Sequence, residues 1–162
     1  MAMSAFGVGV DIHAGGSDLR FPHHAYHSAM AEAFTGVSPY ARGWLHVGVV
    51  TIGGVKMAKS VGNLVLVEDL LVRHSAAAIR LMILDRPWSE DWDYTDASLE
   101  AAAARLADLY RAAGRTHETS RNGAAEIRRL LGADLDVPAA LEAAIETGGA
   151  PARLLIATLG LD

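Results

Sequence analysis

The pattern of hydrophobic and polar positions changes character near residue 87. Before that point, short apolar runs alternate with glycine-rich turns, which is typical of strands and loops. After it, Ala, Leu and Arg recur at helical spacing, and neither part contains an internal repeat. The pattern predicts a short α/β segment followed by an all-helical segment. We place one domain over residues 1–64 and a second over residues 65–162.

Two apolar runs in the first part are typical of strands. The first covers 8–15 and ends in glycine, and the second covers 44–54 and closes in a tight Gly–Gly turn. Between them, Pro22 is a favourable first residue for a helix that we expect to continue to Phe34 and to end before Gly36. Because only two strands can be placed, we predict a partial Rossmann-like, mostly parallel sheet rather than a complete doubly wound one.

The second part is dominated by one long amphipathic pattern over 96–114. Its predicted inner face consists of Leu99, Ala102, Leu106, Leu109 and Ala113. Shorter helices are expected at 68–74, 76–84, 124–131, 138–146 and 151–159, and a connector at 85–94. These segments predict a C-terminal bundle of four to five helices packed beside the sheet.

Composition and charge narrow the class of protein. The chain has 162 residues, of which 51% are hydrophobic and 20% charged, as in a folded globular protein. No apolar run approaches the roughly 20 residues of a membrane span, and the start does not resemble a secretory signal. The lack of cysteine excludes disulfides and thiolate-bound metals, and the net charge of −5 argues against non-specific polyanion binding. We therefore expect a cytoplasmic protein without membrane contact.

The stretch GGVKMAKSVGN, over 53–63, contains the only two lysines of the chain, Lys56 and Lys59. The other twelve basic residues are arginines. Two ammonium groups in a glycine-bounded loop suit a mobile clamp on phosphate oxygens, and a solvated surface turn is the alternative. Because arginine replaces lysine freely at ordinary surface sites, the exclusive use of lysine here favours a binding site. We expect this loop to lie at the junction of the sheet and the bundle.

A second candidate segment is DIHAGGSDLRFPHHAYH, over 11–27. Gly15 and Gly16 would allow the backbone to approach a ligand closely. Asp18 can accept hydrogen bonds from ribose hydroxyls, although capping the next helix is the simpler alternative.

Histidines are concentrated in the same segment. His23 and His27 are four residues apart and share a helix face, as metal-binding histidines often do; a half-buried structural stripe is the favoured alternative. His24 points elsewhere and can hydrogen-bond a phosphate or a carboxylate. We expect His13 and His46 to be isolated, packed side chains.

The order and separation of these segments resemble the second half of a class I cysteinyl-tRNA synthetase, and more closely its relative, the mycothiol cysteine ligase. The resemblance rests on DIHAGGSDLRFPHH, WLHVGVVTIGGVKMAKSVGN and AAAIRLMIL. The segments GNLVLV, ADLDVPAALEA and GAPARLLIATLGLD favour the ligase. The resemblance covers nearly the whole chain.

The resemblance implies a role for each motif. KMAKS corresponds to the KMSKS signature loop, which binds ATP and stabilises the transition state of amino-acid adenylation, so Lys56, Lys59 and Ser60 take the catalytic roles. Nucleotide contacts are implied for Gly15, Gly16, Asp18, His24, Val47, Val49 and Met57. His23 lies where the family has a zinc-ligating histidine, and that zinc selects cysteine through its thiol.

Three departures from the family pattern bear on activity. The chain lacks the N-terminal half, with its HxGH signature and first zinc-ligating cysteine, and has no cysteine near its start, where the family has the second. Ala58 replaces the middle serine of the signature loop. Ala25 and His27 stand where the synthetases have two glutamates, the second a zinc ligand, and His23 with His27 are too few for a closed tetrahedral site.

These observations leave three hypotheses open. The chain is part of a split enzyme that is completed by a separate HxGH-containing N-terminal subunit, it is a non-catalytic binding, regulatory or scaffold protein, or it is a helical interaction module. Ligase activity is expected only with the HxGH-containing partner. An open sheet edge would be covered by that partner or by a second copy in a homodimer. If transfer occurs, we expect a small-molecule amine acceptor rather than tRNA.

Overall fold

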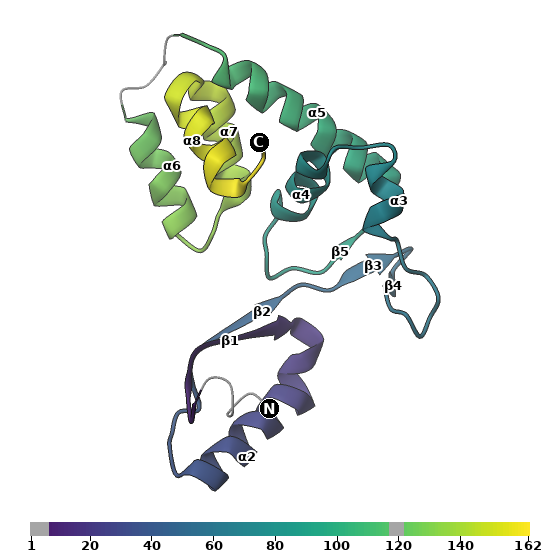
Figure 1. The fold of residues 1–162 in the computed structure, drawn as a ribbon, viewed down its shortest axis with the longest axis vertical. Helices are drawn as coiled ribbons and strands as arrows, with labels where there is room; N and C mark the ends of the chain where they lie inside the picture. The colour runs from purple at the N-terminus through teal and green to yellow at the C-terminus, as the bar shows by residue number, and fades with distance from the viewer. Residues whose placement is uncertain (1–6, 117–121) are drawn as a thin grey trace. The chain divides into compact units, whose positions relative to one another are not determined.

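The computed structural model describes residues 7–116 and 122–162 of the chain. The chain forms two compact units, Met1–Thr51 with Ser89–Trp92 and Ile52–Trp88 with Asp93–Asp162. It passes to the second unit within β3 (Val50–Ile52), returns to the first between Trp88 and Ser89, and passes to the second again within β5 (Trp92–Asp93) (Figure 1). The predicted domain boundary after residue 64 stays a prediction.

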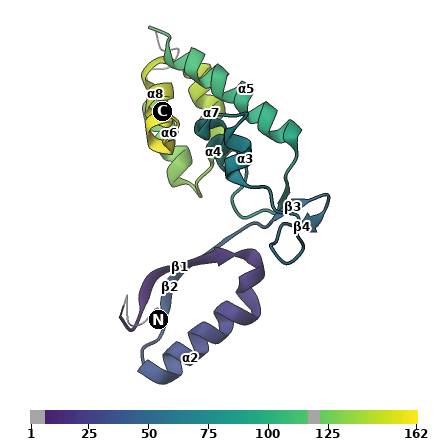
Figure 2. The ribbon, with the colours of Figure 1, turned by 45° about the vertical axis from the view of Figure 1, so that its right-hand side comes forward.

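The N-terminal unit is built on a pair of parallel strands. β1 (Val10–Gly16) pairs with β2 (Ala41–Val47) in a register that joins Val10 to Ala41 and Gly16 to Val47. Parallel neighbours need a crossover connection, and here it contains α2 (Ala25–Thr35), which lies to one side of the strands in both ribbon views (Figures 1 and 2). The predicted partial parallel sheet is therefore confirmed.

The crossover helix starts later than predicted. The chain leaves β1 through two short turns, η1 (Ser17–Leu19) and η2 (Arg20–His24), and Phe21 is extended at φ −140° and ψ 135°. A residue before proline is disfavoured in the helical region, so the regular helix begins only after this turn. The helix ends as predicted, at Gly36 with φ 70°, a conformation that glycine adopts readily.

The second predicted strand is interrupted. Strand β2 ends before Gly48, and the next strand, β3, begins at Val50. A turn at Gly53 and Gly54 joins β3 to β4 (Val55–Lys56). Both turn glycines have positive φ, 58° and 76°, as a two-residue hairpin turn requires, so the predicted Gly–Gly turn is confirmed. These strands belong to a second, three-stranded sheet of order β4-β3-β5, separate from the β1-β2 pair.

The second unit contains six helices within its described residues, close to the six predicted ranges, although the bundle was expected to contain four to five. They are α3 (Val67–Leu71), α4 (Ala76–Leu84), α5 (Asp96–Ala113), α6 (Gly123–Gly132), α7 (Val137–Thr147) and α8 (Gly149–Leu159). The long α5 contacts α4, α7 and α8 and lies alongside them (Figure 2). None of the helices in the described ranges is long and apolar enough to cross a membrane.

The buried face of α5 follows the amphipathic pattern closely. Four of its five predicted inner residues are buried, and the fifth inner position is Ala112 rather than Ala113. The helix begins where Thr95 accepts a hydrogen bond from the Ser98 N–H and Ser98 Oγ accepts one from the Thr95 N–H. The architecture is thus mixed α/β with a small parallel sheet, followed by helices, as predicted.

Candidate functional site

The carboxyl ends of β1 and β2 lie side by side because the two strands are parallel. Gly15 pairs with His46 and Gly16 with Val47. In open α/β sheets, ligands bind in the crevice outside this edge. The structure therefore brings the predicted residues Gly15, Gly16 and Val47 together, while their nucleotide contacts stay predictions.

Asp91 forms hydrogen bonds to the loop after β1 and to the loop after β2. Its Oδ1 accepts a hydrogen bond from the Val49 N–H at 2.6 Å and one from Ser17 Oγ at 3.3 Å. The neighbouring Trp92 N–H donates to the Val49 carbonyl at 3.0 Å. Asp91 was not predicted as a site residue, because the sequence pattern of 85–94 indicates only a connector. The acidic residues of that segment were the available signal.

Gly48, between the predicted residues Val47 and Val49, has no room for a side chain. A Cβ atom there would lie 1.8 Å from the Glu90 carbonyl oxygen, which belongs to rigid backbone. The close approach of segment 89–92 to the end of β2 therefore depends on glycine at this position.

Gly15 and Gly16 make room for side chains of the same chain. A Cβ on Gly15 would lie 2.7 Å from His24 Cε1 and 3.0 Å from His24 Nε2. A Cβ on Gly16 would lie 2.5 Å from Asp18 Oδ1. The two glycines thus allow His24 and Asp18, both predicted nucleotide contacts, to lie against the end of β1.

Four histidines gather beside this edge. His24 Nδ1 lies 2.9 Å from His46 Nε2, so one ring donates a hydrogen bond and the other accepts it. The His13 ring centroid is 4.5 Å from that of His24 and 5.0 Å from that of Trp44, and His27 lies 6.2 Å from His13. The prediction that His13 and His46 are isolated is wrong, because strand pairing and the turn after β1 bring them to His24.

Burial disfavours charge in this cluster. Burial lowers the pKa of His24, which is only 5% exposed, and the neighbouring His13 and His46 lower it further. Burial also lowers the pKa of His13, followed by the effects of His27 and His46. Both rings are therefore held neutral near neutral pH, in a form that can accept as well as donate a hydrogen bond.

The two candidate metal ligands, His23 and His27, are exposed on the turn before α2 and on α2 itself. Within the described ranges, no group of three or more His, Cys, Asp or Glu side chains is placed to hold a metal ion. Zinc binding by His23 and His27 therefore stays a prediction, and a closed site would need ligands from elsewhere.

Asn63 holds the lysine loop in shape. Its Oδ1 accepts from the Ala58 N–H at 2.9 Å, and its Nδ2 donates to the Lys56 carbonyl at 3.2 Å. The Val61 and Gly62 N–H groups donate to the Ala58 carbonyl, and Gly62 has φ 76°. The loop is therefore a defined turn that presents Lys59 and Ser60 at the surface, with Met57 half-buried.

Asp93 fixes the hairpin from which this loop emerges. Its two carboxylate oxygens accept hydrogen bonds from the Gly53 N–H at 3.1 Å and the Gly54 N–H at 2.9 Å. Like Asp91, it was missed in the sequence, since it lies about 40 residues from the turn. Lys56, Met57, Lys59 and Ser60 belong to the second unit, whereas the strand-edge residues belong to the first.

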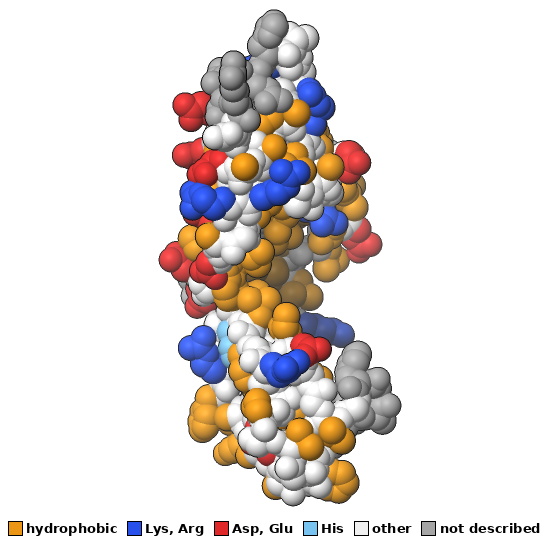
Figure 3. Space-filling model, turned by 90° about the vertical axis from the view of Figure 1, so that its left-hand side faces the viewer, with side chains coloured by type: hydrophobic (Ala, Val, Ile, Leu, Met, Phe, Trp, Pro, Cys, Tyr) orange, Lys and Arg blue, Asp and Glu red, His pale blue; other side chains and the backbone are white. Residues whose placement is uncertain are grey.

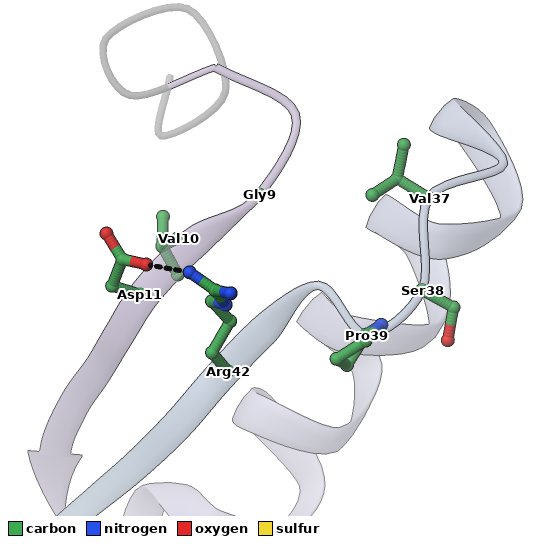
Figure 4. A pocket seen from close by; sticks show the side chains of 7 residues that line it. All are labelled: Gly9, Val10, Asp11, Val37, Ser38, Pro39 and Arg42. Atoms are coloured by element: carbon green, nitrogen blue, oxygen red, sulfur yellow. Dashed lines mark hydrogen bonds and ion pairs between the residues drawn. The ribbon is translucent and has the colours of Figure 1, made fainter.

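A separate pocket of about 300 Å³ opens at the amino ends of β1 and β2 (Figure 4). Asp11 and Arg42, from neighbouring strands, form an ion pair of 3.1 Å across it. Both side chains are largely exposed, and ligands of open α/β sheets bind at the opposite edge. The strand-edge cluster and the lysine loop are therefore the stronger candidates.

The sequence of this chain is similar to a known protein family and to individual proteins. The family described as "tRNA synthetases class I (C) catalytic domain" matches residues 1–104. Two curated relatives are named L-cysteine:1D-myo-inositol 2-amino-2-deoxy-alpha-D-glucopyranoside ligase. The one from Streptomyces griseus is 43% identical over 145 residues, and the one from Streptomyces avermitilis is 44% identical over 147 residues. Each alignment covers 88% of this chain and 36% of the relative.

A cysteine–tRNA ligase of Dehalococcoides mccartyi is 41% identical over 115 residues, which cover 71% of this chain and 25% of that protein. The chain thus spans between 25% and 36% of the length of these three relatives. Among solved structures, a leucyl-tRNA synthetase of Agrobacterium radiobacter, in a ternary complex with tRNA and LeuAMS, superposes with a TM-score of 0.61. That match covers 93% of this chain and 26% of the synthetase at 14% identity, which supports the fold alone.

Proposed function

This chain belongs to the class I (C) tRNA synthetase family, that of cysteinyl-tRNA synthetases and related cysteine ligases. From this membership we propose that the chain supplies the signature loop of a site that forms an aminoacyl adenylate from ATP. The observation that carries the proposal is the lysine loop. Of the only two lysines of the chain, Lys56 ends β4 and Lys59 lies in the turn that follows. Asn63 fixes this turn, and Asp93 fixes the hairpin before it.

The proposed chemistry is the activation of an amino acid. A carboxylate oxygen of the amino acid attacks the α-phosphorus of ATP, a new oxygen–phosphorus bond forms, and the bond to pyrophosphate breaks. Negative charge grows on the phosphate oxygens in the transition state, and the ammonium groups of Lys56 and Lys59 would stabilise it, with the Ser60 hydroxyl as an additional donor. A surface loop can close on the phosphates and open to release them.

We assign the adenosine side to the strand edge. Gly15, Gly16 and Asp18 lie where the family pattern has its GGxD segment, and neutral His24 can donate a hydrogen bond to an anionic oxygen while accepting another. Val47 and Val49 flank the break after β2. Asp91 would act as a positioning residue, since it holds the loops after both strands.

The names of the relatives support a choice of amino acid and of acceptor. Both kinds of relative carry cysteine in their names, which supports cysteine as the activated amino acid. The ligases, named for an amino sugar, align over 88% of this chain against 71% for the tRNA ligase. A small-molecule amine is therefore the favoured acceptor.

The chain would act with a partner polypeptide. Its sequence contains no HxGH motif, which in the family binds phosphate beside the signature loop. We propose that an HxGH-containing N-terminal half, supplied as a separate subunit, completes the site. A second candidate function is nucleotide or adenylate binding without catalysis, which is favoured by Ala58, since it removes one hydroxyl donor from the signature loop.

Calorimetric titration of the chain with ATP and with a non-hydrolysable cysteinyl-adenylate analogue tests the proposal. We expect the analogue to bind more tightly than ATP, and Lys59→Gln to weaken binding at least tenfold, about 1.4 kcal/mol. Arg128→Gln removes the same charge from an exposed position on α6 and should change affinity less than twofold.

Two outcomes would contradict the proposal. One is that neither ligand binds at millimolar concentration, and the other is that Lys59→Gln binds as tightly as the unaltered chain. ATP–pyrophosphate exchange on adding an HxGH-containing half then separates the two candidates: cysteine-dependent exchange identifies the split enzyme, whereas binding without exchange identifies the non-catalytic protein.

A further inference from the structure

α2 exposes large apolar side chains along one side. Ala31 is buried in the small core of the N-terminal unit, whereas Tyr26, Met30 and Phe34 are 58%, 61% and 82% exposed. Their spacing of four residues places them in one row along the helix. Hydrophobic side chains are visible at the surface of the N-terminal unit in Figure 3. Contiguous exposed apolar surface of this kind marks an interaction site.

A row of small residues runs beside the large ones. Each large residue is preceded by an exposed alanine, and these are Ala25, Ala29 and Ala33. At about 100° per residue, the alanine row lies between the large row and the row that contains Ser28 and Glu32. We call these two rows the α2 face. It carries no charge, because the only charged residue of the helix, Glu32, lies outside both rows.

Glu32 is held away from the α2 face by its own hydrogen bonds. Its carboxylate accepts from the hydroxyls of Ser28 and Ser38, each at 2.8 Å, and from the Tyr40 N–H at 2.9 Å. These bonds fix the end of α2 on the turn before β2. The α2 face is thus an uncharged ridge and groove on a helix whose end is held by these hydrogen bonds.

We propose that the α2 face is a self-association surface, on which a second copy of this chain packs its own α2 in the antiparallel direction. Rows of residues four apart interdigitate when two helices cross at about −50°, with the large row of each helix in the small row of the other. A two-fold axis then places Met30 of each copy against Ala29 of the other, with the two Met30 side chains on either side of the axis. Tyr26 of each copy lies against Ala33 of the other.

The chemistry of the α2 face favours a second copy over a nucleic acid or an anionic membrane. A ridge and an adjacent groove with the same spacing are complementary to each other, so one sequence supplies both halves of the contact. The α2 face offers no charge to a nucleic acid or to an anionic membrane.

The available area matches a weak dimer. Phe21, 71% exposed with its ring 6.1 Å from that of Tyr26, extends the apolar surface. With roughly 150–250 Å² for each large side chain, two copies would bury on the order of 1,000 Å² in total, the lower limit for a specific interface. Association through α2 does not depend on nucleotide binding, so its test is independent of the proposed function.

Sedimentation velocity at chain concentrations between about 5 and 200 μM tests the proposal directly, because a small interface is expected to have a micromolar dissociation constant. We expect a reversible dimer of twice the 17.1 kDa chain mass. Met30→Glu places two carboxylates at the two-fold axis and should weaken dimerisation at least tenfold. Val72→Glu makes the same kind of change at a side chain that is 84% exposed outside α2, and it should leave the dimer intact.

Site-specific cross-linking tests the geometry, and the lack of native cysteine removes any background. Met30→Cys should form a disulfide-linked dimer under mild oxidation faster than Phe34→Cys, because the two copies of position 30 lie on either side of the axis and the two copies of position 34 lie far from it. Circular dichroism of each variant shows that it is folded. A monomer throughout the concentration range, a dimer unaffected by Met30→Glu, or faster linkage by Phe34→Cys would overturn the proposal.

Discussion

At the scale of single residues, packing at the carboxyl end of β1 depends on glycine at position 15. Gly15 has no Cβ, and the space is filled by the imidazole of His24 and by Leu19 Cδ1, which would lie 3.1 Å from such an atom. His24 in turn contacts His46, so one position controls how the turn after β1 meets β2.

We predict that Gly15→Ala destabilises the N-terminal unit by about 1–3 kcal/mol, the usual effect of forcing one extra carbon into a packed site. Gly43→Ala, on the neighbouring strand, is the matched control, because its Cβ would meet the nearest atom at an ordinary 3.5 Å. Urea unfolding followed by tryptophan fluorescence measures both variants. Equal stability of the two would show that His24 moves aside at little cost.

At the scale of elements, β1, the turn before α2 and β2 each contribute to the histidine cluster. His13 and His24 have pKa values lowered chiefly by burial, so the folded state binds their protons less readily than the unfolded chain. Where the unfolded state binds more protons, stability rises with pH. The stabilising effect is therefore complete above the ordinary histidine pKa of about 6.5 and is lost as the pH falls below it toward the lower folded values.

We expect amide exchange in β1 and β2 to show this dependence. After correction for intrinsic rates, protection of these strands should fall between about pH 7.5 and pH 5.5, which spans the ordinary histidine pKa. α7 contains no histidine and serves as the internal reference. Protection of the strands that stays constant while the pH falls would contradict the assigned protonation of the cluster.

At the scale of the whole molecule, charge limits the partners. The chain has a net charge of −5, and its fourteen basic residues are distributed along the sequence, with both lysines confined to one loop. Binding of nucleic acid by charge alone requires several cationic side chains that release counterions together.

We therefore predict that the chain does not bind tRNA with a dissociation constant below about 100 μM at physiological salt. Fluorescence anisotropy with labelled tRNA measures this, and the cysteinyl-adenylate analogue serves as the positive control for a folded site. Tighter binding that weakens steeply with added salt would contradict the prediction and would favour tRNA as the acceptor over a small amine.

Local features of the chain were predictable from its sequence. The amphipathic pattern located α5 and most of its buried face, and the glycine pair located the hairpin turn. Such features depend on residues a few positions apart, whose periodicity and backbone preferences act locally. The motif KMAKS, which first indicated the family, is likewise continuous in the sequence.

Contacts between distant segments were decided only by the tertiary structure. Sequence analysis separated His13 and His46, and the fold joins them around His24. It treated the segment with Asp91 and Asp93 as a connector, and the fold uses these carboxylates to hold backbone about 40 residues away. Their partners are set by strand pairing and by close backbone approach at Gly48, neither of which leaves a periodic signal in the sequence.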